Sequence, residues 1–234
     1  MIRRIPARTQ TERSDATSTR LLDAARELFG ADGYHATSIE TVASAAGVTK
    51  GAAYHHFRGK ADLFRAVFVR EQEAITATLE RVAAQAPDPW EALVRGAHTF
   101  LEHCLDPGFR RVVLLDGPAV LGWEGVRRIE YAHTLRVLSA GVQAASDAGH
   151  LAPGDLGARA QLVFGALCEG GMLLARAEDP ARALVGVTEE TRRLLGGLRL
   201  PAAETGAATG ADAGADTRAD AEEPGARGQL GTRG

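Results

Sequence analysis

Residues 33–64 read GYHATSIETVASAAGVTKGAAYHHFRGKADLF, and this stretch decides the fold. Thr37 followed by Glu40 has the spacing of a capping box, which predicts that a helix starts at Ser38. Apolar residues then recur at helical spacing, so one side of this short helix faces inward. These residues are Ile39, Val42, Ala43 and Ala46.

A tight turn and a second short helix follow. Gly47 stands where the turn needs a residue that tolerates a positive φ. Thr49 is a good N-cap for a helix over residues 50–57. Ala53 and Phe57 lie four residues apart, so they face the core together. Two short helices joined by a short turn that contains glycine form a helix-turn-helix.

The exposed side of this second helix carries residues suited to DNA. Lys50, Gly51 and Ala52 form its first turn, which in a recognition helix points at base edges in the major groove. The two small residues allow the backbone to approach the duplex closely. Hydroxyl and ring N–H donors for phosphates or bases come next. They are Tyr54, His55 and His56.

The charge distribution agrees with an N-terminal DNA-binding module. The net charge is only −3, but residues 1–70 hold 11 Lys and Arg against 7 Asp and Glu. The rest of the chain is neutral to acidic. A basic segment attached to an acidic body is the asymmetry expected of a protein that neutralises phosphates with one part of its chain.

The rest of the chain predicts an all-α protein. No segment alternates with the period of a strand, and apolar residues recur at helical spacing between glycine and proline breakers. A long helix is expected to begin at Leu63, to run through Val82 and to stop before Pro87. Further helices are expected at about 90–105, 109–121, 124–148, 155–178 and 181–198. We expect a flexible basic arm at 1–17, a DNA-binding domain at 18–64, a helical body at 65–200 and a disordered Ala/Gly/Asp tail at 201–234.

Residues 18–64 resemble the tetracycline-repressor (TetR) family without a gap. The family pattern runs from a helix that ends in Phe and Gly to a Lys-x-x-Leu segment. The matching residues are Phe29, Gly33, Thr37-Ser38, Val42-Ala43, Ala46-Gly47-Val48-Thr49, Tyr54-His55-His56-Phe57 and Lys60-Ala61-Asp62-Leu63.

The resemblance implies a homodimer. Three N-terminal helices would bind DNA, and a larger C-terminal domain would dimerise and usually hold a small-molecule inducer. Ala52 stands where many relatives carry Thr or Ser, which puts one base contact in doubt. Matched positions imply phosphate contacts from Thr37, Ser38, Tyr54, His56 and Lys60, and base contacts from Lys50, Ala52 and His55; with Thr49 and Gly51 they form the expected DNA-binding set.

The resemblance also implies that the two last helices pair with those of a second copy, and the small and apolar residues that recur on them would allow close packing. The alternative is that the same stripe fills the core of a monomer. The expected dimer interface consists of Leu162, Gly165, Ala166, Glu169, Gly170, Leu184, Val187, Thr191, Leu194 and Leu195.

A ligand pocket is expected in the central region, lined mostly by apolar side chains with a few polar ones. The alternative for each of these residues is that it only fills the core. The candidates are Phe100, His103, Cys104, Phe109, Leu114, Trp123, Tyr131, Leu135, Phe164, Cys168 and Met172.

Together these features favour a cytoplasmic DNA-binding transcriptional regulator, a repressor that a small-molecule inducer releases from a palindromic operator. The alternative is a helical small-molecule-binding protein or enzyme whose N-terminal module no longer binds DNA. The sequence has no motif of a catalytic serine, a P-loop or a zinc protease, so we expect no catalytic residues and no cofactor. His98 and His103 lie five residues apart, on different sides of a helix, so we expect no metal site. We expect neither a signal peptide nor a membrane span.

Overall fold

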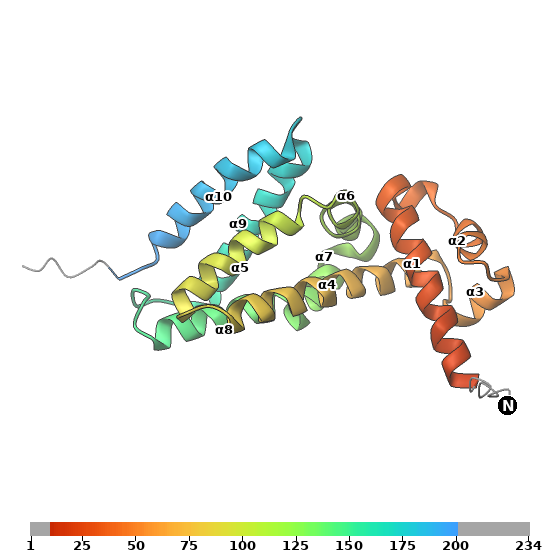
Figure 1. The fold of residues 1–234 in the computed structure, drawn as a ribbon, viewed down its shortest axis with the longest axis horizontal. Coiled ribbons are helices and arrows are strands. Elements are labelled where there is room, and N and C mark those ends of the chain that lie inside the picture. Colours follow the sequence, from red (N-terminus) through yellow and green to blue (C-terminus); the bar gives the residue numbers. More distant parts are fainter. Residues whose placement is uncertain (1–9, 201–234) are drawn as a thin grey trace, which may run out of the picture. The chain divides into compact units, whose positions relative to one another are not determined.

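The computed structural model describes residues 10–200, and within this range the secondary structure is helical (Figure 1). The expected all-α class is confirmed, since the described residues contain no strand, only an isolated bridge between Leu151 and Arg199. The expected tail at 201–234 and residues 1–9 of the expected arm lie outside the described residues. The elements are α1 (Gln10–Ala36), α2 (Ile39–Ala45), α3 (Lys50–His56), α4 (Lys60–Ala84), α5 (Pro89–His103), α6 (Pro107–Phe109), the π-helix η1 (Arg110–Asp116), α7 (Gly117–Ala132), α8 (Thr134–Asp147), α9 (Leu156–Arg176) and α10 (Pro180–Gly196).

The first helix is longer than its apolar pattern suggested. α1 begins at Gln10, which corrects the expected arm, because residues 10–17 already belong to the helix. These residues are polar, so hydrophobic periodicity could not mark them as helical, although nothing in them opposes a helix. The glycines at positions 30 and 33 predict the end of this helix; α1 continues through Gly30, whereas Gly33 interrupts it with a φ of 82°.

The expected helix at 124–148 is divided in two. His133 has a φ of −123° and a ψ of −103°, so α7 ends before it and α8 begins after it. No glycine or proline stands at this break, so no local pattern predicted it. Upstream, Gly122 has a φ of 71° and bends α7. The first half of the helix expected at 109–121 is mostly the π-helix η1.

The N-terminal helices share one small core. Phe29 and Phe64 are fully buried, with their ring centroids 5.2 Å apart and their planes nearly perpendicular. Tyr34 packs against the rings of both. Because Phe64 belongs to α4, the first turns of this long helix complete the core of the DNA-binding part. The other buried residues of this core include Leu21, Ala25, Ile39, Val42, Ala43, Ala53, Phe57 and Leu63.

α4 continues into the body, where it packs against α5 and α8 (Figure 1). α1 also touches the body, because Gly30 and Gly108 let the two backbones meet: a Cβ on Gly30 would lie 2.9 Å from the Cα of Gly108. Arg26 joins the same contact through Asp106 at 2.8 Å and Glu71 at 3.3 Å. Among the described helices, none combines the length and the apolar character that a membrane crossing requires.

Candidate nucleic-acid interface

The start of α2 differs from the predicted capping box. The N-cap is Ser38, whose hydroxyl accepts a hydrogen bond from the Thr41 N–H at 3.0 Å. Thr37 is buried, and its hydroxyl donates to the Gly33 carbonyl at 2.9 Å. Thr37 therefore fastens the end of α1, and this corrects its role as the cap. Adjacent Thr and Ser are both good caps, so the sequence could not choose between them.

The turn and the start of α3 follow the prediction. Gly47 has a φ of 64°, and the Thr49 hydroxyl accepts a hydrogen bond from the Ala52 N–H at 3.1 Å. Ala53 and Phe57 are buried, as their spacing predicted. One side of α3 is thus fixed to the core, and the other side presents Lys50, Gly51, Tyr54 and His55 to solvent, with Ala52 and His56 partly exposed.

Glu40 links α2 to the exposed side of α3, a role that the sequence did not indicate. Its carboxylate lies 2.7 Å from the Lys50 ammonium and accepts a hydrogen bond from the Tyr54 hydroxyl at 3.3 Å. The Lys50 ammonium also lies 5.7 Å from the centre of the Tyr54 ring. The hydrogen bond from Lys50 lowers the pKa of Glu40, and the same bond raises the pKa of Lys50. One acidic residue therefore contacts two expected DNA-binding residues.

Lys60 lies at the start of α4 and holds the end of α1. Its ammonium donates to the Tyr34 carbonyl at 2.9 Å and lies 4.3 Å from the centre of the Tyr34 ring. It also reaches the His35 carbonyl at 3.4 Å. This arrangement places a positive charge beside the free N–H groups of the α4 N-terminus, where a phosphate would be favourably bound.

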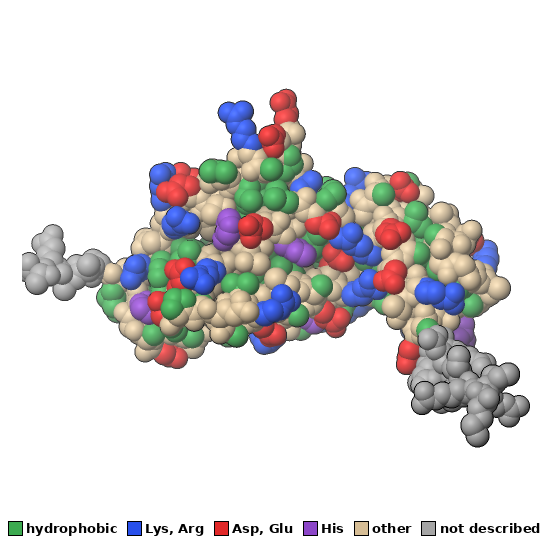
Figure 2. Space-filling view, viewed as in Figure 1, with side chains coloured by type: hydrophobic (Ala, Val, Ile, Leu, Met, Phe, Trp, Pro, Cys, Tyr) green, Lys and Arg blue, Asp and Glu red, His purple; other side chains and the backbone are tan. Residues whose placement is uncertain are grey.

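Basic and acidic side chains are interspersed over α1 to α3 on the face that Figure 2 shows. The basic excess of the N-terminal segment therefore does not form one continuous patch on this face. The exposed groups of α3 are the better guide to a DNA contact, because they lie together on one helix whose orientation the core fixes.

The expected pocket residues separate into three groups. Phe100 and Phe164 line an apolar cavity between α4, α5, α8 and α9. A second hollow lies between η1, α7 and α9, and five of the expected residues line it, including Phe164 again. Burial raises the pKa of the Cys168 thiol in this hollow to about 12. The remaining five line neither space. The second group is Leu114, Trp123, Phe164, Cys168 and Met172, and the third is His103, Cys104, Phe109, Tyr131 and Leu135.

The residues expected at a dimer interface also divide. Leu162 and Leu194 are 75% and 64% exposed, and Gly165, Ala166 and Glu169 are exposed as well. In contrast, Gly170 and Leu195 are buried within the chain, where a Cβ on Gly170 would lie 2.9 Å from Leu101. Leu184, Val187 and Thr191 are half-buried. The exposed group leaves apolar side chains on α9 and α10. Leu173, which was not among the expected residues, lies on the same side of α9 as Leu162, whereas the exposed Val185 lies on the side of α10 opposite Leu194.

Comparison with known proteins agrees with both parts of the fold. Residues 21–67 match the family model of bacterial regulatory proteins of the tetR family, and residues 90–198 match the tetracyclin repressor-like C-terminal domain. A crystal structure of a TetR-family transcriptional regulator from Pectobacterium atrosepticum is 30% identical, covers 83% of this chain and 99% of its own, and superimposes with a TM-score of 0.70.

Two curated relatives from Escherichia coli are similar over shorter stretches. The TetC protein of transposon Tn10 is 30% identical over 120 residues, which are 51% of this chain and 60% of TetC. The regulator UidR of strain K12 is 39% identical over 64 residues, 27% of this chain and 32% of UidR. The chain thus matches less than two thirds of either relative's length. The structural match, which covers 99% of the Pectobacterium chain, and the two family models nevertheless agree, and the chain belongs to the TetR family of bacterial transcriptional regulators.

Proposed function

We propose that this protein is a DNA-binding transcriptional regulator, and that two copies of α3 enter successive major grooves of a palindromic operator. The observation that carries the proposal is the setting of α3: Thr49 caps it, Ala53 fixes its inner side, and its outer side is exposed. In this arrangement Lys50, Ala52 and His55 would face base edges.

Phosphate contacts would flank this helix. Ser38 at the start of α2, Tyr54 and His56 on α3 and Lys60 at the start of α4 carry donors on or near the same surface. The Thr37 side chain is buried and its hydroxyl is engaged by Gly33, so only its backbone N–H could serve in such a contact. Contacts of this kind position the protein on the duplex but do not read the sequence.

Dimerisation would bring the two reading helices together. The exposed apolar side chains on one side of α9, Leu162 and Leu173 at 75% and 51% exposure, form a surface suited to being covered. Covering them with the same face of a second copy would form an isologous interface.

Release by a small molecule would act through α4. The N-terminal end of this helix carries Leu63 and Phe64 in the DNA-binding core, and its far end carries Leu79 and Ala83 in the wall of the apolar cavity. A ligand that binds better when α4 is displaced would shift the population toward a spacing of the two α3 helices that no longer fits the operator.

Fluorescence anisotropy with labelled DNA from upstream of the protein's own gene tests the proposal. We expect wild type to bind this DNA more tightly than unrelated DNA, with an affinity that falls steeply with salt. Ala52→Glu should abolish binding, because it places a carboxylate on the first turn of α3. Ala77→Glu, the same change at an exposed alanine of α4, is the matched control and should bind like wild type. Equal binding by both variants, or no specific binding by wild type at low salt, would refute the proposal.

A further inference from the structure

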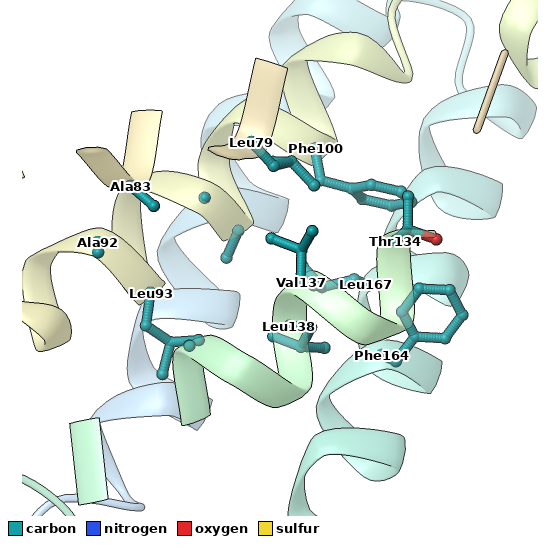
Figure 3. Close-up of a pocket in the computed structure, with 13 residues that line it drawn as sticks. Leu79, Ala83, Ala92, Leu93, Phe100, Thr134, Val137, Leu138, Phe164 and Leu167 are labelled. Carbon is teal, nitrogen blue, oxygen red and sulfur yellow. The ribbon is translucent and has the colours of Figure 1, made fainter. Parts of the chain in front are cut away.

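The apolar cavity between α4, α5, α8 and α9 has almost no polar atom in its wall (Figure 3). Its lining residues include no charged side chain and a single hydroxyl, that of Thr134. This hydroxyl already donates to the buried side-chain carbonyl of Gln72 at 2.7 Å. A charged group placed here would lose its hydration without a partner, which is strongly unfavourable.

The cavity continues outward into a second, larger hollow. The inner cavity measures about 60 Å³ and the outer hollow about 480 Å³. Ala83, Ala92, Val137 and Gly141 line both spaces, so the two are adjoining parts of one site. The inner part accepts only the end of a molecule, whereas the two parts together reach the size of an ordinary ligand pocket.

The outer hollow differs from the inner cavity in its charge. Glu80 and Arg136 line it and form an ion pair with each other, with their charged atoms 2.7 Å apart, and both are about half exposed. Asp88 also lines the hollow. The rim thus carries two carboxylates against one guanidinium, and it can accept a polar or cationic group that remains in contact with water.

We infer that the effector of this protein is an elongated amphiphile with an uncharged, apolar end, which enters the inner cavity, and a polar end, which stays at the rim between Glu80, Asp88 and Arg136. The inference assigns a ligand class to the small-molecule site and rests on the proposed function only for its regulatory meaning. Binding itself depends on the cavity alone.

Gly96 of α5 offers a clean way to block the inner cavity. It lines this space, and a Cβ added to it would meet no atom within 4 Å. Gly96→Leu therefore extends its side chain into the cavity without a backbone clash, and it replaces a poor helix former with a good one. Gly96→Ala is the matched control, because it makes the same gain in helix propensity but adds only one methyl group. Gly141→Val fills the site from α8, where a Cβ would lie 3.7 Å from Leu93, an ordinary contact distance.

The first experiment measures binding of the uncharged fluorescent probe N-phenyl-1-naphthylamine. Wild type and Gly96→Ala should bind the probe similarly, and Gly96→Leu and Gly141→Val should bind it about tenfold more weakly or worse. Circular dichroism and a thermal unfolding curve establish that each variant is folded. Probe binding that is absent in wild type, or that both folded filling variants retain, would overturn the inference.

The second experiment separates the two ends of the ligand by competition with the probe. Octylamine carries one charged end and 1,8-diaminooctane two, on a chain of the same length. The rim does not repel cations, so the first ammonium group of either compound can stay there. If the diamine competes more weakly than octylamine, the cause is its second ammonium group, which would have to enter the inner cavity. We expect octylamine to compete about tenfold better or more, and equal competition would contradict the assigned class.

Anisotropy with operator DNA on the same proteins keeps this inference apart from the proposed function. A protein that binds the probe as expected but no DNA would refute only the proposed function. A protein that binds DNA but shows no effect of the filling variants on the probe would refute only the ligand class.

Discussion

The exposed side of α3 and the inner cavity are both small sets of side chains, but the chain builds them in opposite ways. The position of α3 is set by residues that lie close together in the sequence, at the turn before it and along it. They are Gly47, Thr49, Ala53 and Phe57. The cavity wall draws on four helices between Leu79 and Leu167. Local contacts therefore determine the polar surface, and long-range packing determines the apolar hole.

This difference has a physical consequence for mutations. A change on the outer side of α3 removes no buried contact, so it should alter DNA binding without altering folding. A change in the cavity should alter ligand binding without altering DNA binding by the unliganded protein. α4 is the exception, because its two ends belong to the two regions.

The largest effect is expected for Phe64→Ala, at the end of α4 that completes the DNA-binding core. Phe64 is fully buried against Phe29 and Tyr34, both with ring centroids 5.2 Å away. Removing the ring should lower the free energy of unfolding by about 3–5 kcal/mol and abolish DNA binding. Urea denaturation measures the loss. Phe164→Ala, in the cavity wall, is the comparison: it should also destabilise the protein, yet its folded fraction should bind DNA normally. If Phe64→Ala had the same free energy of unfolding as wild type, the two aromatic contacts would not be maintained in solution.

Lys50→Ala should have the next largest effect, and only on DNA. Lys50 is exposed on the first turn of α3, so its loss should weaken operator binding by about 1–3 kcal/mol and relax the preference for the operator sequence. Titration of the variant against operator and unrelated DNA measures both changes. Arg81→Ala removes the same charge from an exposed site on α4 and should leave both affinities unchanged. A uniform loss on all DNA would instead make Lys50 a phosphate contact.

The same contrast decides how much of the molecule could be predicted from sequence. The glycine turn, the Thr49 cap and the buried pair Ala53 and Phe57 follow local rules, and each stands where the pattern of residues 33–64 placed it. Thr37 shows the limit of such rules, since a local pattern offers two neighbouring caps and only the packing of α1 settles which one is used.

The cavity lay beyond local rules. Phe100 and Phe164 were among the candidates because they are large and apolar, but the wall also needs Gly96 and Gly141, whose role is to leave space. No pattern along one helix shows that two glycines of different helices face the same hole. Glu40 was missed for a related reason: its partners Lys50 and Tyr54 lie on the next helix, and only the angle between α2 and α3 brings them together.

Glu40→Gln should have a smaller effect with the opposite sign. The Glu40 carboxylate holds Lys50 and Tyr54 and lies beside the expected path of the DNA, so it competes with phosphates for both donors. Replacing it with an uncharged amide should strengthen binding to unrelated DNA by about threefold at low salt, and less at high salt, because exposed ion pairs are weak and screened. The ratio of operator to unrelated affinity should fall. Weaker binding to both kinds of DNA would mean that Glu40 orients the two donors instead of withholding them.

The smallest effect concerns His103, which lies where α5 meets the Arg26 contact between α1 and the body. Burial lowers the pKa of His103 below its ordinary value of 6.5, and the positive charge of Arg26 acts in the same direction, against the carboxylates of Glu71 and Asp106. The folded protein therefore binds this proton less readily than the unfolded chain. Stability is unaffected by His103 above pH 6.5 and falls as the pH drops from 6.5 toward the lower folded pKa. His103→Gln should remove this part of the acid dependence. We therefore expect the urea midpoint of wild type to fall further between pH 8 and pH 5.5 than the urea midpoint of the variant, and most of this difference should develop between pH 6.5 and 5.5. Parallel curves over this range would show that the imidazole is as well hydrated in the folded protein as in the unfolded chain, and that the contact between α1 and the body is open to water at this point.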